Sequence, residues 1–234
     1  MTPISAPETV DHVQYRSVSG LAVLALLLGV LSATALAHPG AWVMPLPAIV
    51  CSLWALRRIQ RQPDELLGRK AALIGLTLAL GFGTWAPSRY YCDRWLLNRQ
   101  AREFIEEWFQ YVLQGELEVA HQATLDYYLR QPEGTLLDEF YQDNPEDLTE
   151  LQTFFSRGIA QDLVDLGADG RVRFEKSLEM LFVGGSCQIS QRFLLYRTDQ
   201  DEPVARAQIR VARDTQQDVV YWTVLGLVDA DLID

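Results

Sequence analysis

The chain of 234 residues carries a formal net charge of −11, and this charge is divided unequally along it. Up to Pro87 there are six basic and four acidic residues, a net charge of +2, whereas the remainder has 14 basic and 27 acidic residues, a net charge of −13. An acidic segment of this size repels phosphate backbones, so nucleic acid is excluded as an expected partner. The change in composition predicts the main domain boundary near Pro87.

Three apolar runs, residues 20–37, 42–56 and 71–87, contain no Lys, Arg, Asp or Glu. The first would span about 27 Å as a helix, close to the ~30 Å hydrocarbon thickness of a bilayer. In the second, Pro45 and Pro47 indicate a helix that begins at Pro45 or later. The third is rich in glycine, which favours close contacts between helices in lipid.

Two other interpretations of these runs stay open. Buried helices of a soluble protein would need a surrounding core that an 87-residue segment does not provide. A cleaved signal peptide is suggested by the Ala-x-Ala-like site in "SATALAHPG". The leading tail is long for a signal peptide, however, and it holds Glu8 and Asp11 with only Arg16 as a basic flank. We therefore expect lipid around all three runs.

A basic turn separates the second and third runs, with Arg57, Arg58, Arg61, Arg69 and Lys70. Positive charge stays cytoplasmic, which places the 57–70 loop and the N-terminus inside and the chain after Pro87 outside. Four arginines beyond the third run, Arg89, Arg94, Arg99 and Arg102, oppose this orientation. With Arg16 included, the cytoplasmic side carries six basic residues against these four.

These features predict a multi-pass protein of the cell membrane, with the lipid bilayer as its first partner. The expected segments are an N-terminal tail over residues 1–19, a three-helix transmembrane region over 20–87 and a linker over 88–97. An extracytoplasmic domain is expected over residues 98–234.

The front half resembles the small bacterial membrane module catalogued as domain of unknown function 4190. The residues that carry the resemblance are "ALRRI" at 55–59 and "GRKAALIG" at 68–75. The sequence departs from that family at Lys70, where a small residue is common, and in its aromatic-rich second run. The family has no assigned activity. The resemblance implies a membrane anchor joined to an extracytoplasmic domain.

From Trp95 the pattern is that of a water-soluble α+β domain. Apolar residues recur at helical spacing at Ala101, Phe104, Ile105, Trp108, Val112 and Leu113. Gly115 is expected to end this helix, and a shorter helix follows it. Residues 131–143 are expected to form a loop or irregular helix. A single helix is expected over 144–166, capped by Asn144 and stopped by Gly167.

The period then changes from helical to alternating. Four strands are expected near residues 171–183, 188–198, 203–213 and 218–228. In the third, Ala205, Ala207, Ile209 and Val211 face one way, and Arg206, Gln208 and Arg210 face the other. Such alternation is typical of a half-buried antiparallel strand. The predicted fold of this domain is α+β, with helices packed on a four-stranded antiparallel curved sheet.

The opening "FIEEWFQYVLQGELEVAHQAT" is similar to that of the nuclear-transport-factor-2-like superfamily of cone-shaped α+β domains. The matching features are the first helix, the small break after it, and Ala120 and Thr124 in the second helix. That superfamily includes enzymes with an acid/base residue inside the cone and many members that only bind or dimerise. The resemblance therefore implies a fold and leaves activity open.

Candidate catalytic residues are few. His121 is the only histidine of this domain and could act as a general base, with Asp126 or Asp162 as the orienting carboxylate. A packed or surface histidine is the favoured interpretation, because no second histidine or known spacing accompanies it. Ser186 follows two glycines that are typical of a turn or bulge, so a catalytic triad is not supported. We assign no catalytic, cofactor-binding or metal-binding residue.

The three cysteines, Cys51, Cys92 and Cys187, are too scattered for a zinc site. A disulfide between Cys92 and Cys187 stays open, against two thiols that act as small apolar side chains. The acidic turn at 199–203 lacks the spaced ligands and glycine of a calcium loop.

The aromatic residues of the second half are expected to form a core rather than a ligand cavity. They are Trp108, Phe109, Tyr111, Phe154, Phe155, Phe174, Phe182, Phe193, Tyr221 and Trp222. The sequence therefore predicts a non-catalytic, membrane-tethered binding or assembly domain, whose partner is a protein or a small apolar ligand. The alternative is an enzyme or small-ligand carrier with a pocket, anchored to the membrane.

Overall fold

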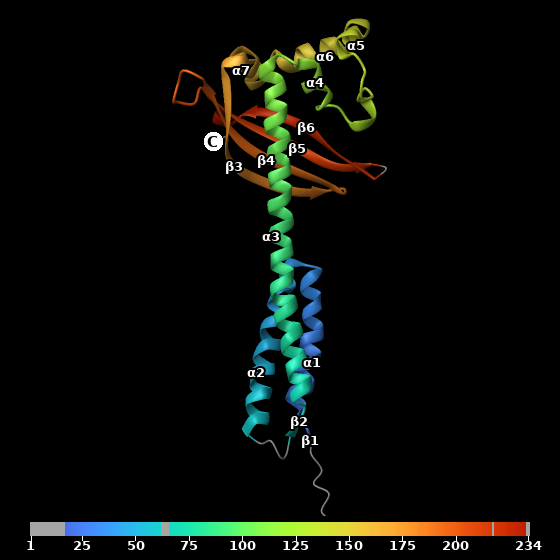
Figure 1. Ribbon diagram of the computed structural model, residues 1–234, viewed down its shortest axis with the longest axis vertical. Coiled ribbons are helices and arrows are strands. Elements are labelled where there is room, and N and C mark those ends of the chain that lie inside the picture. The colour runs from blue at the N-terminus through green and yellow to red at the C-terminus, as the bar shows by residue number, and fades with distance from the viewer. Residues whose placement is uncertain (1–16, 62–65, 217, 233–234) are drawn as a thin grey trace, which may run out of the picture. The chain divides into compact units, whose positions relative to one another are not determined.

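The computed structural model describes residues 17–61, 66–216 and 218–232. The chain divides into two compact units, Met1–Arg94 and Trp95–Asp234. We name them the apolar unit and the α+β unit. Helix α3, Arg69–Gln114, contributes residues to both (Figure 1).

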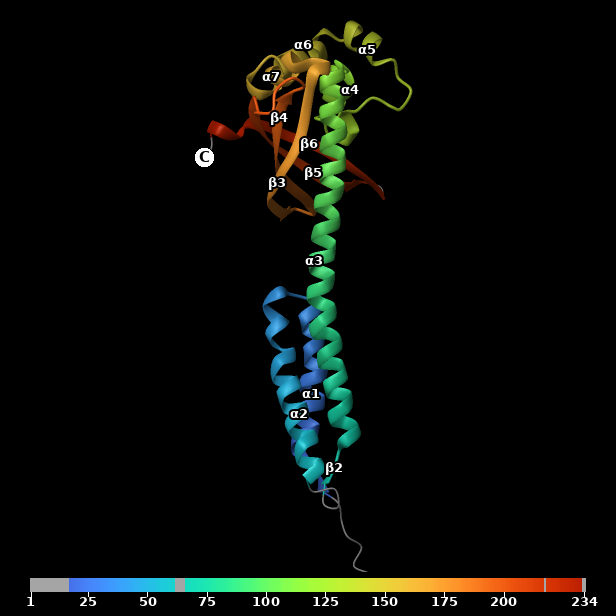
Figure 2. The ribbon, with the colours of Figure 1, turned by 60° about the vertical axis from the view of Figure 1, so that its left-hand side comes forward.

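The apolar unit is built from helical segments that lie side by side (Figures 1 and 2). They are α1 (Gly20–Leu31), the short 3-10 helices η1 (Ser32–Leu36) and η2 (Pro39–Val43), α2 (Pro45–Arg61) and α3 up to Arg94. Two-residue strands, β1 (Ser17–Val18) and β2 (Leu66–Leu67), pair in parallel. Helix α2 begins at Pro45, which confirms the start predicted from the two prolines.

Two helical stretches of the described residues are long and apolar enough to cross a membrane. They are Pro39–Arg61 and Arg69–Gln114, and only 22% of the most apolar window of each is buried. The third apolar stretch, Gly20–Leu36, is shorter. Length and composition therefore single out two of the three stretches that the sequence predicts to cross the membrane.

Residues 88–97, expected as a linker, are helical and belong to α3. Pro87, expected to close the third apolar run, lies inside the helix. A proline removes one helical hydrogen bond, and the residues beyond it favour the helix through side-chain pairs four residues apart. These pairs are Arg89–Asp93 at 3.6 Å, Arg99–Glu103 at 2.8 Å and Arg102–Glu106 at 2.7 Å.

The α+β unit begins with the end of α3 and a series of short helices. These are α4 (Leu117–Gln122), η3 (Tyr127–Leu129), α5 (Leu137–Asp143), α6 (Pro145–Phe155), α7 (Gly158–Leu166) and η4 (Gly167–Asp169). Helix α3 ends at Gln114, directly before Gly115, as the sequence predicts. The segment 131–143, predicted as a loop or irregular helix, contains α5.

The single helix predicted over 144–166 is wrong, because the structure has two helices there. Arg157 is extended, and Gly158 has a φ of +53°, a conformation that favours glycine. The apolar stripe continues across this break, since Phe155 of α6 and Ile159 of α7 are both buried. Periodicity alone therefore gave no sign of the interruption. Asn144 precedes α6, but its side chain donates to the Phe140 carbonyl oxygen instead of capping.

A four-stranded antiparallel sheet completes the unit, in the order β3-β4-β5-β6 (Figure 1). The strands are β3 (Gly170–Val183), β4 (Ser186–Arg197), β5 (Ala205–Gln216) and β6 (Val219–Asp229), followed by η5 (Ala230–Leu232). Gly184 and Gly185 form the β3–β4 turn with φ values of +60° and +92°, which suits a two-residue hairpin. Helices against a four-stranded antiparallel sheet confirm the predicted α+β class.

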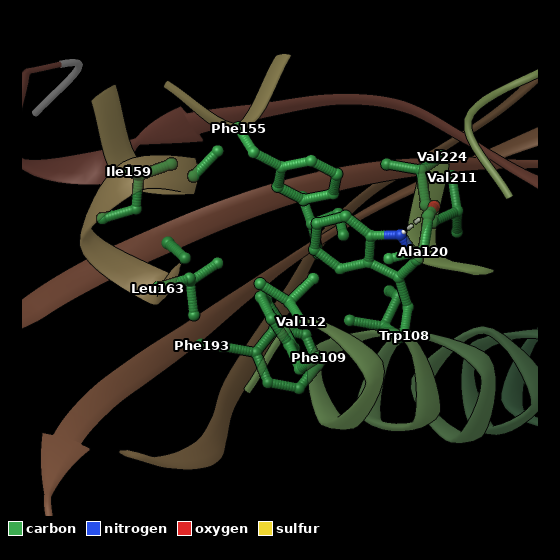
Figure 3. Packing of buried hydrophobic residues seen from close by; sticks show 14 of the residues in the cluster. Trp108, Phe109, Val112, Ala120, Phe155, Ile159, Leu163, Phe193, Val211 and Val224 are labelled. Atoms are coloured by element: carbon green, nitrogen blue, oxygen red, sulfur yellow. Dashed lines mark hydrogen bonds between the residues drawn. The ribbon is translucent and has the colours of Figure 1, made fainter. Parts of the chain in front are cut away.

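Aromatic side chains fill the space between α3, α6 and the sheet (Figure 3). Trp108 is 1% exposed, and its indole nitrogen donates to the Ala120 carbonyl oxygen at 2.9 Å. Its ring stacks on Phe155 with centroids 6.4 Å apart. Phe109 lies edge-on to Phe193 of β4 at 5.2 Å. These side chains form a packed core.

Candidate functional site

His121 lies in the core, where its surroundings do not resemble a catalytic dyad. Its side chain is 2% exposed, and Nδ1 lies 2.8 Å from the hydroxyl oxygen of Tyr141. The Gln122 amide donates to the same hydroxyl oxygen at 2.8 Å. The three side chains hold α4 against α5, which is the structural role favoured from the sequence.

Burial lowers the pKa of His121 below its ordinary value of 6.5, while the negative charges of Glu150 and Asp147 partly oppose this change. In the unfolded chain His121 binds a proton more readily. The stability that neutral His121 provides is therefore present above about pH 6.5 and is lost as the pH falls towards the lowered native pKa.

We expect the free energy of unfolding of the wild type to fall faster between pH 7.5 and pH 5 than that of His121→Gln. The difference arises within this window and is at most about 1.4 kcal/mol for each pH unit. Urea unfolding of both proteins in detergent checks it, since all other ionisable groups are shared. Parallel pH profiles would contradict the assignment of a buried, neutral His121.

The carboxylates considered as partners of His121 make other contacts. Asp126 accepts a hydrogen bond from the Tyr128 hydroxyl group at 3.1 Å. Asp162 lines a shallow hollow with Asp165, Leu166, Arg197, Val204 and Ala205. Ser186 opens β4 after the predicted glycine turn. The geometry therefore assembles neither the base–carboxylate pair nor a triad from these residues.

No disulfide joins Cys51, Cys92 and Cys187 among the described residues. Cys187 is buried in the core of the α+β unit, and Cys92 is exposed. Within the described ranges, no group of three or more His, Cys, Asp or Glu side chains could hold a metal ion.

An open groove of about 570 Å³ runs between α3 and β3 of the α+β unit. Its lining is Trp95, Asn98, Arg99, Arg102, Glu103, Glu106, Phe174 and Ser177. The guanidinium carbon of Arg102 lies 4.7 Å from the ring centroid of Phe174. Both arginines of the lining are paired with glutamates of α3, so the groove has no uncompensated charge that would select a ligand.

The edge of the sheet at β6 is covered by the segment after α4. Arg130 donates to the carbonyl oxygens of Trp222 at 2.6 Å and Leu125 at 3.0 Å, and to the hydroxyl group of Thr223 at 2.9 Å. The Val224 amide also donates to the Ala123 carbonyl oxygen at 2.9 Å. At the opposite edge, β3 pairs with β4 alone among the described strands.

One face of the sheet packs on the core, and the other carries half of the cations of the unit. Register places alternate residues of β3, β4 and β5 on this second face. We define the basic face by its six cations: Arg171, Arg173, Lys176, Arg192, Arg206 and Arg210. All but Arg192 are exposed. The unit holds 12 basic and 26 acidic residues, so half of its cations lie on this one surface.

The cations of the basic face lie next to one another across strands. Lys176 of β3 is directly opposite Arg192 of β4, which is 6% exposed at the centre of the face. Next to this pair, Arg173 of β3 and Arg206 of β5 lie on either side of Leu194 of β4. The three strands therefore bring cations that are far apart in the sequence onto one surface.

Part of this surface is predictable from the sequence. The alternation in the third strand predicts that Arg206 and Arg210 face outward, but it does not indicate which residues of the first two strands lie beside them. The alternate arginines at 171 and 173 were the available signal. Lys176 and Arg192 could be matched only once the register was known.

Comparisons with known proteins add no family to this description. No family model, no curated protein and no solved structure matches the chain. The resemblances to domain of unknown function 4190 and to the nuclear-transport-factor-2-like superfamily therefore stay predictions.

Proposed function

We propose that the protein is a membrane-anchored, non-catalytic binding protein. Three apolar helices hold it in the bilayer, and the α+β unit presents the basic face to an anionic partner outside the cytoplasm. One observation supports the membrane anchor: in the apolar unit, the exposed side chains are large and apolar, and the buried residues are mainly small.

The exposed surface of the apolar unit consists of large side chains. Those at least 40% exposed include Val23, Leu24, Leu27, Val30, Leu46, Val50, Leu53, Trp54, Leu73, Ile74, Leu80 and Trp85. A soluble helical bundle buries such side chains. Contact with lipid tails would remove this cost, so the surface supports the proposal of a bilayer-embedded bundle.

The buried surface of the same helices consists mainly of small residues. They are Ala22, Ala25 and Gly29 of α1, Ala48, Ser52 and Ala55 of α2, and Ala72, Gly75 and Ala79 of α3. Helices that associate in lipid use small residues because these let the backbones approach closely. The α1 segment takes part in this packing in the same way as the two longer helices, which supports a third span.

Two exposed threonines of α3 donate their hydroxyl groups within the helix itself. Thr77 donates to the Leu73 carbonyl oxygen at 3.0 Å, and Thr84 donates to the Leu80 carbonyl oxygen at 2.8 Å. A polar group that faces hydrocarbon needs such a partner, since lipid tails offer none.

Aromatic side chains gather at the end of the bundle where α2 begins. Trp42 lies edge-on to Tyr90 with ring centroids 5.3 Å apart and 5.9 Å from Tyr91. Arg94 lies over the ring of Tyr90 at 4.7 Å. Trp and Tyr favour the interface between lipid and water, so this cluster supports a membrane boundary at this level.

Orientation is tested with reporters that function only outside the cytoplasm. A fusion after Asp234 should be active, and a fusion inserted within the 57–70 loop should be inactive, because basic loops stay cytoplasmic. The reverse pattern would place the α+β unit in the cytoplasm. Recovery of the intact chain as a soluble monomer without detergent would contradict the anchor itself.

A further inference from the structure

We infer that the partner of the basic face is an extended acidic segment of another protein, with carboxylates at alternate positions. It lies along β3 over Arg171, Arg173 and Lys176. This inference rests on the proposed function, because it names the partner of the same binding surface.

The spacing of the cations along β3 matches that of an extended partner segment. Residues two apart on a strand lie about 7 Å apart and point to the same side. Arg171 and Arg173 of β3 have this separation, and Lys176 continues the row after one register shift. An extended segment has the same repeat, so carboxylates at every second position meet this row one for one. A helix, with neighbours on one face three or four residues apart, does not match it.

The side chains of the basic face are suited to binding carboxylates. Five of the six cations are arginines, whose planar fork accommodates a carboxylate with two parallel hydrogen bonds. Arg206 pairs with Asp231 at 3.2 Å, and Arg210 donates to the Ser190 hydroxyl oxygen at 3.2 Å. Within the part of the chain that the structure describes, no ion pair joins Arg171, Arg173 or Lys176 to a carboxylate. The β3 row therefore offers its donors to a partner.

Charge around the face limits the size of the ligand. The unit has 12 basic and 26 acidic residues, a net charge of −14, and Glu179 and Asp231 border the face itself. An anion that extends past the face comes within the screening length of about 8 Å of these acids, and they repel it. An anionic bilayer surface or a second copy of the unit brings far more negative charge than one acidic segment. A single acidic segment is therefore favoured over a bilayer surface or a second copy of the unit.

The test uses the full chain in nanodiscs of zwitterionic lipid and two fluorescent octapeptides of equal composition. One alternates Glu and Thr, and the other has four Glu followed by four Thr. We expect fluorescence anisotropy at low salt to show several-fold tighter binding of the alternating peptide. Arg171→Glu/Arg173→Glu should weaken that binding at least tenfold. Arg99→Glu/Arg157→Glu, which changes the net charge equally, should weaken it less than threefold.

The contrary results separate the inference from the proposed function. Equal affinity for both peptides would overturn the extended, alternating partner. So would binding of phosphatidylglycerol vesicles, but of neither peptide, that is lost in Arg171→Glu/Arg173→Glu. After either result the basic face would still be a binding surface, as the proposed function states. If this variant binds peptides and vesicles as the wild type does, the inference and the binding function fail together. A chain that does not enter nanodiscs overturns the anchor.

Discussion

Replacing Gly75 by Leu is expected to disrupt the packing of α1 against α3. A Cβ atom at Gly75 would lie 2.5 Å from the Ala25 carbonyl oxygen, and one at Gly29 would lie 2.6 Å from the Gly75 carbonyl oxygen. These contacts are with backbone, so no side-chain rotation relieves them. Overpacking of a core usually costs about 1–3 kcal/mol, and we expect the upper end or more. Titration with SDS, followed by circular dichroism, measures the unfolding of the bundle.

Gly81→Leu is the matched control, because it lies on the same helix and a Cβ there meets nothing within 4 Å. It should unfold at the same SDS fraction as the wild type. If Gly75→Leu also unfolds at the same SDS fraction as the wild type, the close contact between α1 and α3 is absent in the bilayer. The packing of α1 would then no longer support a third span.

Trp108→Ala is expected to destabilise the α+β unit by about 3–5 kcal/mol, the usual range for removal of a buried large aromatic side chain. The indole is 1% exposed and lies between Phe109 and Phe155 (Figure 3). The change also leaves the Ala120 carbonyl oxygen without its donor. Urea unfolding in detergent, followed by near-ultraviolet circular dichroism, measures the loss.

Two variants separate the causes of this effect. Trp95→Ala removes an indole that is 61% exposed and should change stability by less than about 0.5 kcal/mol. Trp108→Phe keeps most of the apolar volume and loses the hydrogen bond, so an intermediate loss is expected. A loss below about 1 kcal/mol for Trp108→Ala would mean that the helix–sheet interface is hollow, as the ligand-carrier alternative requires.

The strands could be predicted from the sequence because one face of the sheet is buried. In β5, Ala207, Ile209 and Val211 are buried and alternate with exposed or half-buried polar residues, as the periodicity indicates. A period of two is diagnostic when a core selects it. The end of α3 was also predictable, since Gly115 follows Gln114 directly.

Other features depend on information that local sequence does not contain. The break between α6 and α7 lies inside an unbroken apolar stripe, so only the conformation of Gly158 reveals it. Continuation of α3 through Pro87 reflects a balance between one lost hydrogen bond and many helix-favouring residues. Prediction of the basic face depends on knowing that Lys176 pairs with Arg192. A register shift after Phe174 determines this pairing.

That shift has a second member, and the two together affect how the length of β3 can change during evolution. Pairing slips by one residue between Phe174 and Lys176 and again between Ser177 and Glu179, so Glu175 and Leu178 are extra residues opposite no residue of β4. Deletion of Glu175 alone would remove its bulge, while Lys176 and the residues after it would keep their partners and their side of the sheet. The same holds for Leu178. Homologous chains should therefore lose either residue without exchanging the two faces of the sheet.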